Sequence, residues 1–270
     1  MARRTAAALL LVAAATVPWF APAEILPRAL LAVVPLACMK TIQIAATPGA
    51  WPLWRRLWHL CAPFDVCRTQ SVKPALEWRM LGSILLHGAI GGAALLVFAQ
   101  LKGLTGLLHA ATRMLCAAVL VYALAESMAE TVRLGHRIVG IKVPPIQRVP
   151  ILSRSAADFW GERWNRPMSE WLYRFVFLPL VRRRHPTLGL FAAFGVTAAV
   201  HAWMAAAAGL GAQATVMMGA FFLVQGAAVF AETRLGLPTW PALAAHTWTV
   251  FVLLAPSPLF LSSLLRVLRF

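Results

Sequence analysis

Two polar features of this strongly apolar sequence have residue types that can carry chemistry. The first is His201, which lies inside the hydrophobic run 188–210, fourteen residues after Thr187. In a helix that separation is about 20 Å, well inside a hydrocarbon layer about 30 Å thick. A histidine at that depth is a functional candidate because its near-neutral pKa suits general-base work. A packing histidine bonded to a backbone carbonyl is the alternative that this residue alone leaves open.

The second feature is the cluster SAADFWGERWN at residues 155–165. It places two carboxylates, an arginine, three aromatic rings and an asparagine within eleven residues. Ser153 or Ser155 is positioned to cap a helix at this point. Asp158 would then lie in the first turn, where a carboxylate interacts favourably with the helix dipole.

The pattern that follows predicts a helix over 158–173. Glu162 and Arg166 are spaced as an i,i+4 ion pair on that helix. Pro167 is expected to kink or restart it, because proline removes a backbone hydrogen bond.

Composition places the chain among membrane proteins. Of its 270 residues, 60% are hydrophobic and 13% charged, whereas soluble domains are about one quarter charged. A span needs about 20 apolar residues, so we predict an all-α, polytopic transmembrane helix bundle of about seven to eight spans with interfacial amphipathic helices. We expect one integral membrane domain over 1–270 and a break in the last run at Pro256 and Pro258. The candidate spans are 5–20, 25–39, 80–99, 104–125, 188–210, 212–231 and 242–261.

The net charge of +16 follows the positive-inside rule better than it suggests nucleic-acid binding. Arginine and lysine gather at the N-terminus, over 40–79 and over 133–184, which lie on one side if the spans alternate. We therefore expect a multi-pass protein of the plasma membrane, or of the inner membrane in a bacterium, with the cluster 155–165 in the cytosol. The first run, after Arg3 and Arg4, is also compatible with a cleavable signal peptide.

The region around the loop cysteines predicts surface anchoring rather than a metal site. Cys61 and Cys67 lie near His59 and Asp65, but that spacing matches no zinc pattern, so we expect no metal. The surrounding stretch 47–79 is rich in tryptophan and arginine. We expect it to lie along the membrane surface, where such amphipathic side chains suit the headgroup layer.

Four further polar residues fall in apolar runs: Arg113, His87, His109 and His246. Together with His201, three of them (His87, Arg113 and His246) could line the polar path of a transporter or channel. Each can equally be a hydrogen-bonded packing residue. His246 could also assist His201 or substitute for it.

The sequence from Asp158 to Asn165, DFWGERWN, resembles the wax-synthase-like branch of the membrane-bound O-acyltransferase (MBOAT) family. That branch carries a similar signature followed by an intramembrane histidine, and here His201 comes 36 residues after Asn165. The resemblance covers the signature region 153–203 and elsewhere rests on hydropathy. It implies an MBOAT-like fold with an internal tunnel.

The resemblance also implies an enzyme. It would transfer an acyl group from acyl-CoA, a co-substrate and not a bound cofactor, to the hydroxyl of a lipophilic alcohol, as a long-chain-alcohol O-fatty-acyltransferase does. His201 takes the place of the catalytic histidine, and Asn165 that of an asparagine that assists at the oxyanion or fixes the acyl donor. The basic tract 182–184 could attract coenzyme A phosphates. The implied substrate-binding residues are Asp158, Trp160, Arg163, Trp164 and Thr197, the last of which could orient the imidazole.

Two departures from the family pattern bear on these expectations. The chain is short, which implies fewer spans around the tunnel, and Ala202 follows the histidine where a more polar residue is expected. A catalytically inactive scaffold that keeps the motif for folding is therefore a third hypothesis, beside the acyltransferase and the transporter.

Overall fold

The computed structural model describes residues 34–47, 51–101 and 105–267, together with the single residues 16, 24 and 28. Within these ranges the regular elements are helices, apart from one antiparallel pair of two-residue strands, in agreement with the predicted all-α class. The α-helices are α3 (Val34–Ala46), α4 (Leu53–Cys61), α5 (Trp78–Gln100), α6 (Leu107–Ile138), α7 (Ala156–Asp158), α8 (Arg166–Leu172), α9 (Leu178–Arg182), α10 (Pro186–Ala207), α11 (Ala212–Arg234), α12 (Ala242–Leu254) and α13 (Ser257–Val267).

Short elements connect these helices. The π-helical turns η4 (Phe159–Arg163) and η5 (Tyr173–Phe177) flank α8, and the strands β1 (Gln70–Ser71) and β2 (Ile141–Lys142) pair beside the ends of α5 and α6. The 3-10 turns are η2 (Val66–Arg68), η3 (Pro150–Leu152) and η6 (Leu237–Thr239).

Four described helices, α5, α6, α10 and α11, are long and apolar enough to cross a membrane. The pair α12 and α13 is bent by 45° and makes a fifth if it counts as one span, which confirms the break predicted at Pro256 and Pro258. These helices match the five predicted runs between 80 and 261. The predicted span 5–20 and most of 25–39 lie outside the described residues.

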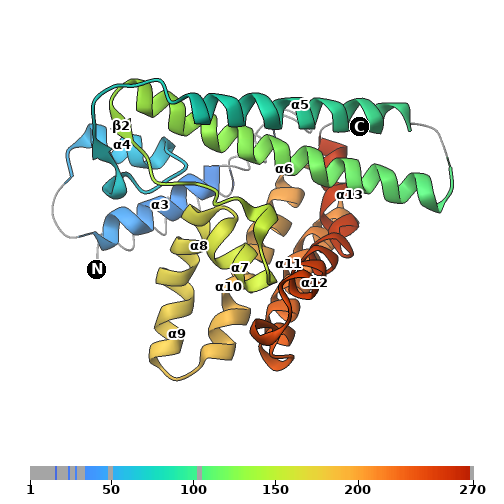
Figure 1. Ribbon diagram of the computed structural model, residues 1–270. Coiled ribbons are helices and arrows are strands. Elements are labelled where there is room, and N and C mark those ends of the chain that lie inside the picture. Colours follow the sequence, from blue (N-terminus) through green and yellow to red (C-terminus); the bar gives the residue numbers. More distant parts are fainter. Residues whose placement is uncertain are drawn as a thin grey trace.

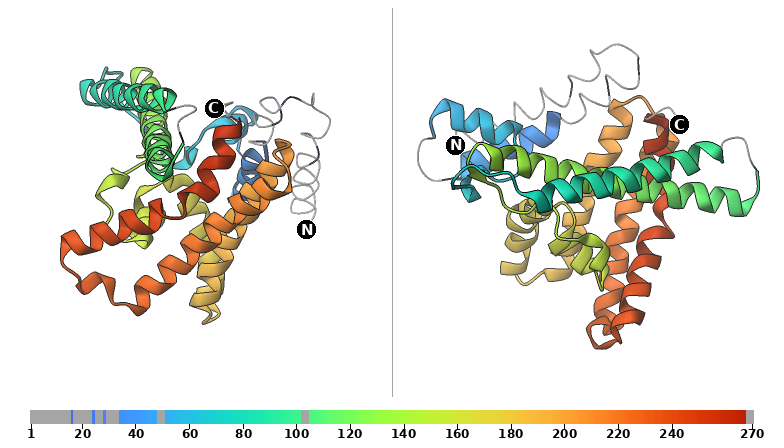
Figure 2. Two further views of the ribbon diagram at one scale, coloured as in Figure 1. Left: turned by 90° about the vertical axis from the view of Figure 1, so that its right-hand side faces the viewer. Right: turned by 45° about the horizontal axis from the view of Figure 1, so that its top comes forward.

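The spans pack as two antiparallel pairs. α5 packs along α6, and α10 along α11. The hairpin of α5 and α6 crosses the other helices and does not run alongside them (Figures 1 and 2). The segment from η3 to α9 lies below this hairpin, next to α10. This arrangement brings the signature region against the helix that carries His201.

Glycines allow α10 and α11 to approach closely. A Cβ atom added at Gly226 would lie 3.0 Å from the Cβ of Phe194, and one added at Gly219 would lie 3.4 Å from the Cβ of Ala202. Small residues at such positions are typical of packed membrane helices, since van der Waals contact between backbones drives their association.

The helix α4 lies within the stretch 47–79, which we expect at the membrane surface, and it is amphipathic. Its Leu53, Trp54 and Leu57 side chains are exposed on one side, while His59 is fully buried on the other. The exposed apolar side is suited to a headgroup layer.

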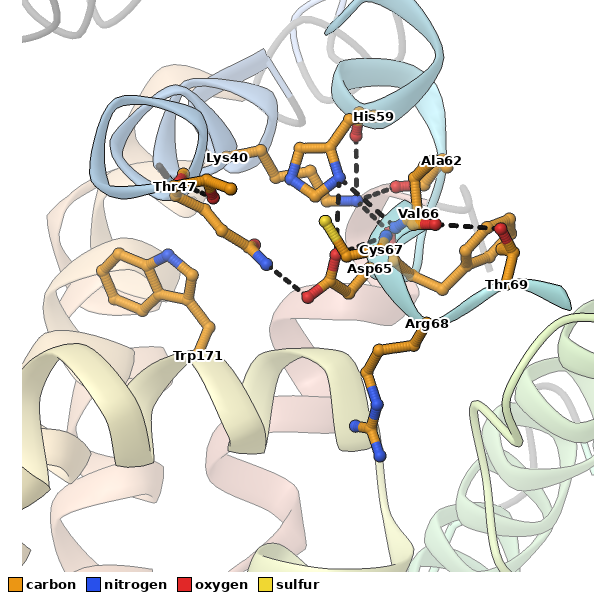
Figure 3. A network of polar contacts seen from close by, with 12 residues as sticks. Lys40, Thr47, His59, Ala62, Asp65, Val66, Cys67, Arg68, Thr69 and Trp171 are labelled. Carbon is orange, nitrogen blue, oxygen red and sulfur yellow. Dashed lines mark hydrogen bonds and ion pairs between the residues drawn. The ribbon is translucent and has the colours of Figure 1, made fainter. Parts of the chain in front are cut away.

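A polar cluster ties α3 to α4 and η2, and we call Lys40, Gln43, His59 and Asp65 the Lys40 cluster (Figure 3). The Lys40 ammonium donates to the carbonyl oxygens of His59 (3.1 Å), Ala62 and Phe64 (2.9 Å), at the C-terminal end of α4. Gln43 Nε2 donates to Asp65 Oδ2 at 2.7 Å. A cation at this helix end satisfies carbonyls that have no partner within the helix.

Burial sets the protonation of this cluster. It lowers the pKa of Lys40 to about 8, against the opposing attraction of Asp65, so the ammonium form holds at neutral pH. Burial, and next the Lys40 charge, lower the pKa of His59 to about 4. His59 is therefore neutral, and its 4.0 Å approach to Asp65 is not an ion pair at neutral pH. No group of three or more metal-ligating side chains occurs in the described ranges, here or elsewhere.

The lowered pKa of His59 predicts acid-sensitive stability. The unfolded chain binds a proton at this histidine below its ordinary value of 6.5, and the folded chain only near 4. The stability contributed by the neutral ring is therefore complete above 6.5 and is lost as the pH falls toward 4, by up to about 3 kcal/mol. Unfolding of the detergent-solubilised protein across this window should show a smaller loss in His59→Gln than in the wild type. The same change at half-buried His109 should leave the loss as in the wild type. Equal losses in all three proteins would contradict the assignment.

Candidate functional site

A cavity of about 1070 Å³ lies between α6, the signature segment, α10, α11, α12 and α13. His201 and Asn165 both line it. The spacing of the two residues in the sequence does not predict this, because they belong to different elements separated by α8, α9 and most of α10. The fold therefore brings the imidazole and the carboxamide to one space.

His201 is held in one tautomer by its own helix. Its Nδ1 lies 2.9 Å from the carbonyl oxygen of Thr197, one turn earlier. Since a carbonyl can only accept, Nδ1 carries the proton, and Nε2 of the neutral ring has a free lone pair. Nε2 has no hydrogen-bond partner within the described ranges. The ring packs on Phe222, with centroids 4.1 Å apart, and near Phe260 at 5.9 Å.

Thr197 orients the imidazole through its backbone. Its hydroxyl donates instead to the carbonyl of Ala193 at 3.0 Å, and its side chain also lines the cavity. The orientation of the ring thus depends on helix geometry and not on the identity of this side chain.

Asn165 lies at the break between η4 and α8. Its backbone is left-handed (φ 42°), a conformation that asparagine tolerates better than most residues. Its N–H donates to Gln147 Oε1 at 2.8 Å, and its carbonyl accepts the first free N–H groups of α8, from Met168 and Ser169. All of its described hydrogen bonds are made by the backbone, so the carboxamide is free to donate into the cavity.

Two charged residues of the signature hold its fold together. Ser155 Oγ caps α7 by accepting from the N–H of Asp158 at 2.8 Å, which confirms one of the two predicted caps. Asp158 Oδ2 then accepts from Arg163 Nε at 2.8 Å, and Arg163 also donates to the carbonyl of Arg148 at 3.2 Å. Neither Asp158 nor Arg163 lines the cavity. Their contacts position the turn that presents Asn165.

The two tryptophans of the signature do line the cavity. Trp160 donates from Nε1 to Gln225 Oε1 at 3.0 Å, and Gln225 donates in turn to the carbonyl of Val252 at 2.9 Å. These bonds join the signature to α11 and α12. Trp164 stacks on Phe159, with centroids 5.4 Å apart.

Glu232, near the end of α11, anchors the beginning of α7. Its carboxylate accepts from the N–H groups of Ala156 (2.7 Å) and Ala157 (3.1 Å) and from Trp248 Nε1 (3.0 Å). Only 3% of Glu232 is exposed. Sequence reasoning missed both Glu232 and the fully buried Gln225. The available signal was an amide and a carboxylate in an otherwise apolar run, which membrane proteins keep only where a partner satisfies them.

His246 lines the same cavity as His201. Its Nδ1 lies 2.9 Å from the carbonyl oxygen of Ser153, so it ties α12 to the start of the signature region. His87 and Arg113 are not among the residues that line the cavity. Of the four residues proposed to line a transporter path, only His201 and His246 therefore line this cavity.

The predicted Glu162–Arg166 pair was wrong, and the structure gives no support for a ligand role of the basic tract 182–184. The helix 158–173 is interrupted at Trp164 and Asn165, so Glu162 and Arg166 do not pair. Arg166 pairs with Glu170 at 2.8 Å, and Glu162 lies 3.9 Å from Arg148. The basic tract 182–184 is exposed at the turn between α9 and α10 and lines neither described cavity, whereas Arg166 lines the large one.

Removing the Glu232 carboxylate should destabilise the protein strongly. Glu232→Ala leaves two backbone N–H groups and one indole N–H without an acceptor, and each buried unpaired donor costs about 1–3 kcal/mol. We expect the free energy of unfolding to fall by about 3 kcal/mol or more. Glu162→Ala is the matched control: its carboxylate is 69% exposed, and its loss should change stability by less than about 0.5 kcal/mol. Equal effects in denaturant unfolding of the solubilised variants would contradict this account.

Residues 143–224 match the model of the membrane bound O-acyl transferase family. A search of curated proteins found no match. The matched segment contains the turn with Asn165, the whole of α10 with His201, and residues 212–224 of α11. The match confirms, over this segment, the resemblance to the membrane-bound O-acyltransferase family that the DFWGERWN signature indicates.

Proposed function

We propose that this protein transfers an acyl group from acyl-CoA to the hydroxyl of a lipophilic alcohol, as the wax-synthase-like branch does. The match of residues 143–224 to the family model supports an acyltransferase. One observation supports the finer proposal most: the cavity that runs along the signature is lined by the His201 imidazole and the Asn165 carboxamide, and within the described residues neither the imidazole Nε2 nor the carboxamide has a hydrogen-bond partner.

The proposed reaction begins at His201. The hydroxyl of the alcohol donates its hydrogen bond to Nε2, and its oxygen attacks the thioester carbonyl carbon as the proton moves to the imidazole. The carbonyl oxygen becomes an oxyanion, to which the Asn165 carboxamide donates. Collapse of this intermediate breaks the carbon–sulfur bond, and the imidazolium returns its proton to the leaving thiolate. The products are an ester and free coenzyme A.

The magnitudes assigned to these groups are ordinary ones for enzymes. A positioned general base contributes about 10²–10⁴ in rate. A single preorganised oxyanion donor contributes about 10²–10³. Trp160, Trp164 and Thr197 would contact the substrates, while Asp158 and Arg163 would act by holding the turn of Asn165 in place.

The location of the substrates follows from their chemistry. Two lipid-soluble tails suit a largely apolar cavity inside a membrane protein, and the charged carrier suits an aqueous face. Glu162, Arg166 and Glu170 give the cavity a polar rim at the signature. We propose that this rim faces the cytosol, where coenzyme A thioesters are found, in a multi-pass integral membrane protein.

The central test replaces His201 and Asn165. Membranes containing the wild type should form ester from labelled acyl-CoA and a lipophilic alcohol. His201→Ala should lower the rate by about 10²–10⁴, and Asn165→Ala by about 10²–10³. The control is His109→Ala, because His109 makes the same bond to the carbonyl four residues earlier (2.8 Å to Thr105) without lining the cavity.

The same experiment separates the alternatives. Ester formation that survives His201→Ala would contradict the assignment of the base. No ester formation by a correctly inserted wild type, with any alcohol, would support an inactive scaffold. Substrate-dependent flux into sealed vesicles would support a transporter. Lipid profiling of cells with and without the protein reports the ester product without presuming its parts.

A further inference from the structure

A second, smaller cavity adjoins the first at the proposed reactive pair. Its volume is about 90 Å³, against about 1070 Å³ for the large cavity. Asn165 and His201 line both, so each of these residues faces a large space and a small one. The two cavities also share Met168, Leu172 and Thr197, while Met39, Val196, Val200 and Met204 line only the small one.

We infer that the small cavity receives the alkyl end of a short acyl group, such as acetyl or propionyl, while the alcohol and the carrier occupy the large cavity. This inference rests on the proposed function. The family resemblance leaves the acyl length open, and the volume of the small cavity beside the reactive pair is what narrows it.

The size of the small cavity sets the limit. A water molecule takes up about 30 Å³ in the liquid, so 90 Å³ holds about three heavy atoms. An acetyl group has three heavy atoms: the carbonyl carbon, the carbonyl oxygen and the methyl carbon. A long acyl chain does not fit in this space, and neither does the charged carrier.

The lining of the small cavity suits an alkyl group. Apart from Asn165, Thr197 and His201, its wall consists of methionine, leucine and valine side chains. The Thr197 hydroxyl already donates to Ala193. Only the two reactive residues then remain to pair with a polar atom, so the carbonyl oxygen would lie beside Asn165 and the methyl group among the apolar side chains.

The wall of the small cavity is held firmly on the side of α3. The carbonyl oxygen of Met39 accepts from Trp171 Nε1 at 3.1 Å, which ties α3 to α8. The next residue is Lys40, whose ammonium binds three carbonyls of the α4 and η2 region (Figure 3). Chain-length selection requires a wall that does not yield to a longer chain, and these bonds supply one.

The test is the acyl-length profile of the reaction. Membranes with the wild type are given acetyl-, butyryl-, octanoyl- or palmitoyl-CoA with one lipophilic alcohol, and kcat/KM is compared across the series. We expect the acetyl donor to be preferred over octanoyl and palmitoyl. Met204→Ala and Val200→Ala enlarge the small cavity, and each should raise the butyryl-to-acetyl ratio of kcat/KM by about tenfold or more, since one methylene in a pocket is worth about 10–200-fold.

The controls keep this test separate from that of the proposed function. Met128→Ala removes a methionine that is 66% exposed and lines neither cavity, so its length profile should equal that of the wild type. A wild type that prefers palmitoyl-CoA, or one that joins long acyl groups to a short alcohol, would overturn the inference and leave the acyltransferase standing. An unchanged ratio in both enlarged variants would also overturn it. Failure of the proposed function is a different result: no dependence of ester formation on His201 with any donor.

Discussion

The constraint on which this structure depends is the cost of leaving a polar group unpaired where water is absent. An unsatisfied hydrogen-bonding group in an apolar interior costs several kcal/mol. The buried polar side chains of the signature region meet this constraint with named partners: Gln225 with Trp160 and Val252, and Glu232 with α7 and Trp248. His201 Nε2 and the Asn165 carboxamide also have no partner within the described residues, but this constraint does not apply to them in the same way: Asn165 is exposed and His201 half-buried, and both face a cavity that can hold a ligand.

The same constraint explains how two kinds of residue divide the work of the signature. Asp158 and Arg163 pair with each other, and each also bonds to the backbone. These contacts fix the turn between η4 and α8. That turn holds Asn165 in a left-handed conformation, with its backbone hydrogen-bonded and its side chain without a hydrogen-bond partner in the described part of the chain. The charged residues of the motif thus position the amide, and the aromatic residues form the wall beside it.

The sequence predicted the elements better than their contacts. Hydropathy located α5, α10 and α11 to within a few residues, because a run of about 20 apolar residues has few other stable environments. It did not predict that Gln225 would reach Trp160, or that Glu232 would anchor α7, because those contacts depend on how α11 packs against a segment 65 or more residues away. The predicted Glu162–Arg166 pair failed for a local reason: the helix breaks at Trp164 and Asn165, so the i,i+4 spacing no longer brings the two side chains together.

One departure from the family pattern has a packing explanation. A polar residue was expected after His201, but the Cβ of Ala202 lies against Gly219 of α11, where an added atom on the glycine would come within 3.4 Å. A larger side chain at 202 would push apart the helices that hold His201 against Phe222. Close contact between α10 and α11 therefore explains why a small residue stands at position 202, where the family resemblance predicts a polar one.

The close packing around His201 also bears on selectivity between alcohol and water. A base that can deprotonate an alcohol can deprotonate water, and water at the same place would hydrolyse the thioester. The rings of Phe222 and Phe260 lie beside the imidazole, with centroids 4.1 Å and 5.9 Å from it. Their apolar surface offers a water molecule no hydrogen bonds. A lipophilic alcohol can lie against such rings and still present its hydroxyl to Nε2, whereas a lone water molecule needs two to four polar partners to stay. In the proposed reaction, a preference for ester formation over hydrolysis would therefore follow from the apolar rings beside the imidazole, which offer water few hydrogen-bond partners.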